Sequence, residues 1–114
     1  MTVSIEKLMY GAMERNASDI HLKVGNPPIY RIDGTLVRLP GDPLTEEDMM
    51  ELLKFITDPP EMTKFEKVME LDCSYMLEGI ARFRVNVCKE DGATRVVMRL
   101  IPLKIQKIPE LGLP

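Results

Sequence analysis

The sequence has few of the residues that hold metals or form disulfides: two cysteines and one histidine among 114 residues. A metal site built from cysteine and histidine needs several such ligands at close spacing, so we expect no metal site. Because the chain shows no export signal, Cys73 and Cys88 are expected to be reduced, with a bridge between them as the lesser alternative. A chain of this size can bury a sufficient core without such cross-links.

The chain also lacks a long apolar run and an excess of basic residues. No segment is long and apolar enough to cross a bilayer, and the start MTVSIEKL does not have the basic and then apolar layout of a signal peptide. We therefore expect a cytoplasmic location without direct membrane insertion. Fifteen Lys and Arg against 18 Asp and Glu give a net charge of −3, which argues against a protein that coats nucleic acid.

Motifs for phosphate binding and nucleophilic catalysis are missing as well. No glycine is followed by lysine, so the chain has no G-x-x-x-x-G-K-[ST], and it has neither G-x-G-x-x-G nor G-x-S-x-G. This chain alone is therefore not expected to hydrolyse ATP. Asp19 and His21 share one side of a predicted strand, but a local polar contact explains them better than acid–base chemistry. We assign no catalytic residue.

The residues that are present describe an ordinary globular domain. A hydrophobic fraction of 45 % with 29 % charged residues is too apolar for a disordered chain, and 114 residues leave no room for a second full domain. Helical spacing, capping residues and alternating segments predict the elements. The predicted elements of the first part are a helix over 5–16, a strand over 20–24 and a hairpin of 29–32 and 35–39 around Asp33-Gly34. Two helices follow, capped by Thr45 and Asp58, and the second is expected to bury Met62, Phe65 and Met69. The last predicted elements are strands over 71–75, 81–87 and 96–100.

Antiparallel strands with an interposed pair of helices define the fold class as α+β. The expected sheet packs one face against helices and leaves the other face available. Charge is divided along the chain: residues 45–72 hold nine acidic residues and three lysines, a net of −6, whereas residues 80–107 hold seven basic and two acidic residues, a net of +5. This division fits either two surfaces that pair within the fold or a basic surface that meets an anion.

Four arginines share one face of the last two predicted strands: Arg82, Arg84, Arg95 and Arg99. A four-residue turn over 89–92 would place Cys88 opposite Ala93 and therefore Arg82 opposite Arg99. Like charges on one patch destabilise a sheet unless an anion or an acidic neighbour lies among them, and arginine makes bidentate contacts with phosphate and carboxylate. The pattern indicates an anion site; a solvated face whose arginines pair with the acidic helices is the open alternative.

Four segments in order carry a family resemblance: N-A-S-D-I-H-L at 16–22, Y-R-I-D-G-T-L at 30–36, A-R-F-R-V-N at 81–86 and M-R-L-I-P at 98–102. In that order and spacing they resemble the N-terminal domain of the PilT-like type IV pilus retraction ATPases, within the type II/IV secretion ATPase superfamily. The resemblance implies a PAS-like domain over residues 1–101. It also implies that residues 102–114 begin the linker to a RecA-like ATPase domain that this chain lacks.

In this family ATP lies between the two domains, and arginines of the N-terminal domain reach its phosphates; the resemblance implies ATP and Mg²⁺ as cofactors of the full-length protein. The resemblance assigns this role to Arg84 and Arg99, with Arg82 and Arg95 as further candidates. The expected partners are the ATPase domain, neighbouring subunits of a homo-hexamer, and a pilus or secretion platform protein of the inner membrane. We expect the machine to lie on the cytoplasmic side of that membrane and to power twitching motility, and this chain alone to bind no cofactor.

Three other functions stay open. A type II secretion or pilus-assembly ATPase would carry the same domain, but the helix that begins within a few residues of Met1 and the Asn86 of R-F-R-V-N favour the retraction branch. A stand-alone PAS-like binding module would need a closed apolar pocket between helices and sheet. A nucleic-acid-binding sheet would need exposed aromatic side chains beside the arginines, and the parity of Phe83 places it on the apolar side instead.

Overall fold

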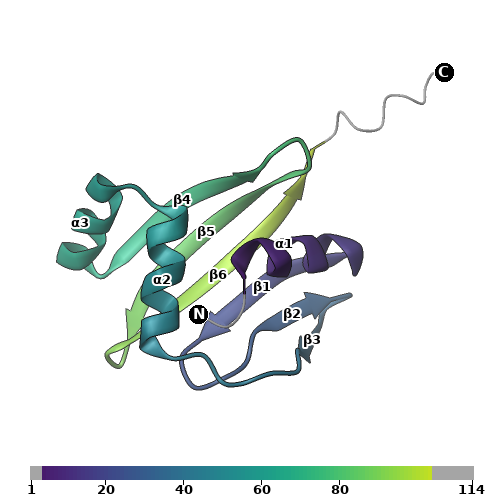
Figure 1. Ribbon diagram of the computed structural model, residues 1–114, viewed down its shortest axis with the longest axis horizontal. Helices are drawn as coiled ribbons and strands as arrows, with labels where there is room; N and C mark the ends of the chain where they lie inside the picture. Colours follow the sequence, from purple (N-terminus) through teal and green to yellow (C-terminus); the bar gives the residue numbers. More distant parts are fainter. Residues whose placement is uncertain (1–3, 104–114) are drawn as a thin grey trace.

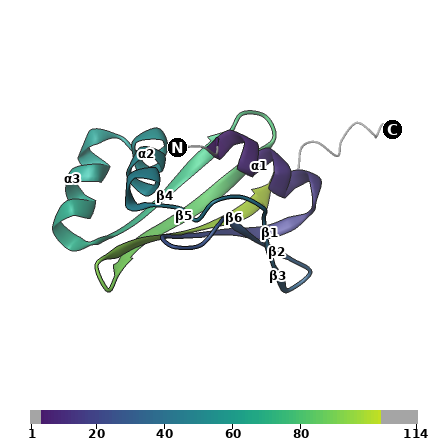
Figure 2. The same ribbon diagram turned by 60° about the horizontal axis from the view of Figure 1, so that its bottom comes forward.

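Residues 4–103 are described by the computed structural model, and they build one antiparallel sheet with three helices on one of its faces (Figure 1). The sheet has six strands in the order β3-β2-β1-β6-β5-β4, so the first and last strands of the chain pair at its centre. Figure 2 shows all three helices on the same side of the sheet. The predicted α+β class is confirmed. The elements are α1 (Ile5–Glu14), β1 (Ala17–Lys23), β2 (Ile29–Ile32), β3 (Thr35–Arg38), α2 (Glu46–Ile56), α3 (Pro59–Val68), β4 (Glu70–Leu77), β5 (Ala81–Glu90) and β6 (Ala93–Pro102).

The helices begin and end where their capping residues predict. Thr45 caps α2 and Asp58 caps α3, and each forms a complete capping box with the residue three positions later. The backbone of Asn16 takes the left-handed conformation just after α1, with φ of 56°. The prediction that Met69 belongs to the buried stripe of α3 is wrong. Met69 is the C-cap of that helix, with φ of 59°, and this left-handed turn leaves its side chain 49 % exposed.

Two hairpins turn on the same dipeptide. Asp33 and Gly34 both have positive φ, as do Asp91 and Gly92, which is the pattern of a two-residue type I′ turn. The turn between β5 and β6 is therefore two residues long, and the predicted four-residue turn over 89–92 is wrong. Cys88 consequently lies opposite Arg95 rather than Ala93. A shift of two residues leaves every side chain on its predicted face but changes its cross-strand partner.

The core fills the space between the helices and the sheet. It takes one face of each central strand, including Ile20 and Leu22 from β1, Phe83 and Val85 from β5, and Met98 from β6, all nearly or fully buried. Alternate residues of these strands therefore point to the face without helices. Both cysteines lie on strands as free thiols. Within residues 4–103, no helix has the length and apolar character needed to cross a bilayer.

The predicted boundary between domain and linker falls at the end of the last strand. β6 continues through Pro102, one residue beyond the predicted domain end at residue 101. Residues 104–114, which hold most of the predicted linker, lie outside the described part of the chain.

Candidate anion-binding site

Polar side chains on the helix-free face form rows that cross the sheet from strand to strand. The register pairs Arg31 with Asp19, Asp19 with Arg99, and Arg99 with Arg84, across β2, β1, β6 and β5. We call these four residues the charged row. Along it the signs run plus, minus, plus, plus, so that the row ends in two adjacent cations. A neighbouring row holds His21, Val97, Asn86 and Asp72.

Asp19 neutralises one half of the charged row. Asp19 is only 8 % exposed, and each of its two carboxylate oxygens contacts a different arginine. Oδ2 lies 3.3 Å from Nε of Arg31, and Oδ1 lies 3.6 Å from Nε of Arg99. The hydroxyl of Ser18 also donates to Oδ2 at 3.2 Å. A buried carboxylate is costly unless it is paired, and these contacts satisfy it.

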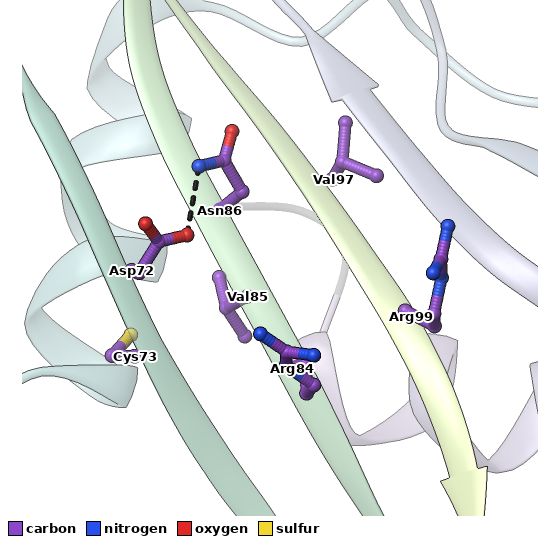
Figure 3. A pocket seen from close by; sticks show the side chains of 7 residues that line it. All are labelled: Asp72, Cys73, Arg84, Val85, Asn86, Val97 and Arg99. Atoms are coloured by element: carbon purple, nitrogen blue, oxygen red, sulfur yellow. Dashed lines mark hydrogen bonds between the residues drawn. The ribbon is translucent and has the colours of Figure 1, made fainter.

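Arg84 and Arg99 lie directly opposite each other at the unbalanced end of the row. Both line a shallow hollow of about 210 Å³, shown in Figure 3 with Asp72 and Asn86 on neighbouring strands. The Asn86 amide donates to Asp72 Oδ1 at 2.9 Å, so this carboxylate is already engaged. Arg84 forms no salt bridge with any residue of 4–103. Residues of like charge directly opposite each other destabilise a sheet, and an anion bound between these two arginines would offset that effect.

The structure separates the other two candidate arginines from this hollow. Arg82 lies opposite Ile101, so the predicted pairing of Arg82 with Arg99 is wrong. Arg95 lies opposite Cys88, and its Nη1 is 3.5 Å from Glu90 Oε1. Both arginines remain on the helix-free face, but neither lines the hollow. The structure therefore brings together Arg84 and Arg99 alone.

The acidic partners of these arginines come from strands. Asp19 of β1 forms an ion pair with Arg99, and Glu90 of β5 forms one with Arg95. Among the described residues, the acidic helices therefore do not provide the partners of these arginines. The acidic first turn of α2 contacts the opposite, helix-covered face of the sheet. There Glu46 accepts hydrogen bonds from the hydroxyl of Thr94 at 2.6 Å and from Nζ of Lys89 at 3.1 Å.

His21 lies between the charged row and a further row formed by Lys23, Arg95 and Cys88. Burial lowers the pKa of its imidazole, as do the guanidinium groups of Arg31 and Arg95, while Asp19 opposes them. Its Nε2 is buried and has no hydrogen-bond partner within the described chain. The expected local contact between Asp19 and His21 gives way to the two arginine contacts of Asp19. Residues 4–103 contain no cluster of three or more His, Cys, Asp or Glu that could hold a metal ion.

Reasoning from sequence missed two members of the charged row. The sequence predicts only a local contact for Asp19 and no role for Arg31, because Asp19 meets Arg99 through the pairing of β1 with β6 and Arg31 meets Asp19 through the pairing of β2 with β1. The usable signal was parity: Asp19 alternates with Ile20 and Leu22, and therefore shares a face with the arginines once the strands are placed together.

Comparison with known proteins identifies relatives over nearly the whole chain. No protein-family profile matches it. The type IV pilus retraction ATPase PilT of Pseudomonas aeruginosa is 34 % identical over 111 residues, which are 97 % of this chain and 32 % of that protein. The type IV pilus ATPase PilU of the same organism is 27 % identical over 98 % of this chain and 29 % of that protein. The chain thus spans about a third of the length of these relatives.

Solved structures give the same result for the fold. The crystal structure of the pilus retraction motor PilT with bound ADP matches 90 % of this chain and 30 % of that chain, with a TM-score of 0.81 and 34 % identity. The X-ray structure of the Legionella pneumophila ATPase DotB matches all of this chain and 34 % of that chain, with a TM-score of 0.74 and 26 % identity.

Proposed function

The chain is homologous to PilT and belongs to the type II/IV secretion ATPase superfamily as an N-terminal domain, and from this premise we propose that Arg84 and Arg99, at the cationic end of its charged row, bind nucleotide phosphates. The observation that carries the proposal is the opposed pair Arg84 and Arg99 beside a hollow. Phosphate oxygens match the planar fork of a guanidinium, and two such forks can hold one polyphosphate group. The PilT structure with ADP supports a nucleotide as the anion.

The proposed role of the arginines is to stabilise charge during phosphoryl transfer. The transferred group carries charge on its outer oxygens, and guanidinium groups placed around it lower the free energy of the transition state. The two arginines suit phosphate oxygens, whereas the described residues offer no cluster of three or more side chains that could hold a metal ion. We therefore propose that the P-loop and the residues that hold Mg²⁺ belong to a RecA-like domain of the full-length protein.

Closure of two domains on one nucleotide would couple turnover to motion. ATP held between the arginine face and the RecA-like domain would favour the closed arrangement, and release of products would allow opening. We propose that this cycle runs in a homo-hexamer at the cytoplasmic side of the inner membrane, against a platform protein, and that it powers pilus retraction. The similarity to the retraction motor supports this assignment.

A second candidate is a secretion or pilus-assembly ATPase with the same N-terminal domain. The match to DotB at a TM-score of 0.74 favours it, since the fold alone does not separate the branches.

Two further alternatives lose support. The hollow between α1 and α2 is an exposed groove with Glu6, Glu51 and Lys54 on its walls, unlike the closed apolar pocket of a binding module. Phe83 is fully buried, so it offers nucleic-acid bases no stacking surface.

The test is to read the parent gene beyond the codon for Pro114 and to assay its full-length product. We expect G-x-x-x-x-G-K-[ST] downstream and ATP hydrolysis by the purified protein. A stop codon directly after Pro114, or a full-length product that binds no nucleotide, would contradict the proposal.

A further inference from the structure

Asp19 is placed on the helix-free face by an irregularity of the sheet. The pairing of β1 with β2 shifts register between Ala17 and Asp19. Ala17 belongs to the core, whereas Asp19, two residues later, contacts the arginines of the other face, and Ile20 returns to the core. A regular strand would send residues 17 and 19 to the same side. The bulge therefore reverses the parity of β1 at the residue that enters the charged row.

Asp19 contacts Arg99 in a way that leaves one edge of the guanidinium free. Oδ1 of Asp19 lies 3.6 Å from Nε of Arg99, the guanidinium nitrogen that is bonded to the aliphatic part of the side chain. A guanidinium has five N–H donors, so the two terminal nitrogens keep donors for another acceptor. The Arg99 side chain is 72 % exposed whereas that of Asp19 is 11 % exposed. The carboxylate thus contacts the Nε side of Arg99, and the arginine also lines the hollow shared with Arg84.

We propose that Asp19 is a positioning residue for phosphoryl transfer, which fixes the guanidinium of Arg99 at the phosphate hollow. The inference rests on the proposed function and adds a residue that does not itself touch the nucleotide. An arginine held in place stabilises the transition state better than one that must be ordered during the reaction. Without the carboxylate, Arg31 and Arg99 repel each other and Arg99 leaves the hollow.

Loss of Asp19 affects binding and chemistry in opposite directions. An asparagine keeps the size of the side chain but removes a negative charge from the surroundings of the phosphates. General electrostatics alone therefore predicts equal or tighter ATP binding. Loss of position predicts a slower chemical step. The expected signature of a positioning role is a fall in kcat without a rise in KM.

The chain offers a matched control on the same face. Glu90 pairs with Arg95 at 3.5 Å, just as Asp19 pairs with Arg99, but neither residue of that pair lines the hollow. Glu90→Gln makes the same change from carboxylate to amide. In the full-length protein we expect Asp19→Asn to lower kcat for ATP hydrolysis at least tenfold with KM unchanged or lower, Asp19→Glu to recover part of that loss, and Glu90→Gln to leave kcat within twofold of wild type.

A second readout uses the present chain without the ATPase domain. In ¹H–¹⁵N spectra the Nε–Hε signal of Arg99, identified by its absence in Arg99→Gln, should be shifted away from those of solvent-exposed arginines. Asp19→Asn should move it to their position while the backbone signals of the core strands stay in place. Should Asp19→Asn fail to fold, Asp19→Ser takes its place in both experiments.

The outcomes separate this inference from the proposed function. Full-length protein without ATPase activity contradicts the proposed function, and the Arg99 signal still decides whether Asp19 holds Arg99. If Arg99→Gln lowers kcat but Asp19→Asn does not, the proposed function stands and the positioning role is overturned. A higher KM with unchanged kcat in Asp19→Asn also overturns it, because Asp19 would then serve binding alone.

Discussion

The phenol of Tyr30, on β2, donates a hydrogen bond of 2.6 Å to the backbone carbonyl of Leu8, on α1, and so fastens the first helix to the sheet. Tyr30 is only 3 % exposed. The close approach requires a glycine one turn further along α1, because a Cβ at Gly11 would lie 2.5 Å from the Tyr30 hydroxyl oxygen. Gly11 therefore makes room for the Tyr30 hydroxyl, at a helical position where alanine would be the better helix former.

Gly11→Ala should lower the free energy of unfolding by about 1–3 kcal/mol, measured by urea denaturation, because the displaced phenol leaves a buried hydroxyl without its acceptor. The matched background is Tyr30→Phe. There the offending oxygen is gone, and the next ring atom would lie 3.5 Å from the new Cβ, an ordinary contact. In that background the same substitution should be neutral or stabilising. An equal loss in both backgrounds would show that Tyr30 is not the reason for the glycine.

Glu46 should be the acidic residue of α2 that matters most for stability. Both its carboxylate oxygens accept from Thr94, which is fully buried, and one also accepts from Lys89. Burial opposes ionisation, but the hydrogen bonds from Thr94 and Lys89 hold the pKa of Glu46 below its usual value. Glu46→Ala should cost about 1–3 kcal/mol, because it leaves buried donors of Thr94 unpaired.

The neighbouring Glu47 provides the control for that measurement. Its side chain is exposed on the same turn of α2, so Glu47→Ala should change the free energy of unfolding by less than about 0.5 kcal/mol. Adding Thr94→Val to Glu46→Ala should recover part of the loss, since the valine has no hydroxyl to satisfy. A double variant as unstable as the sum of both single variants would contradict the assigned contact.

His21 should make the fold less stable in mild acid. Burial lowers the pKa of His21 in the folded state below the ordinary value of 6.5, so the unfolded chain binds the proton first as the pH falls. The free energy of unfolding should therefore decrease between about pH 7 and pH 5, and His21→Gln should remove that part of the decrease. Parallel pH profiles for wild type and variant, from urea denaturation at each pH, would rule out His21 as the cause.

The sequence predicted local structure well because local signals decide it. The capping boxes at Thr45 and Asp58 and the turn at Asp33-Gly34 act over four residues, and each lies where it was expected. Asp91-Gly92 carries the same turn signal as Asp33-Gly34. The predicted register between β5 and β6 is wrong because it rests on a four-residue turn, whereas Glu90 pairs with Ala93 across a two-residue turn.

The site was predictable only in part because its neighbours come from distant segments. Alternation placed Arg84 and Arg99 on the helix-free face, but alternation does not reveal which residue lies across the next strand. The pairing of β1 with β6 joins residues about 80 apart in sequence, and it alone brings Asp19 to Arg99. The bulge before Asp19 is a second feature that no local pattern announced.

Arg84 and Arg99 are proposed to act on the phosphates of ATP. The most direct test is the kcat for ATP hydrolysis by the full-length protein carrying Arg84→Gln or Arg99→Gln. The control is Arg38→Gln, because Arg38 lies on edge strand β3 and its contact is Asn26, at 3.2 Å, away from the hollow. We expect each of the two row variants to lose about a hundredfold or more in kcat, and the control to keep its rate. Wild-type turnover in both row variants would contradict the claim.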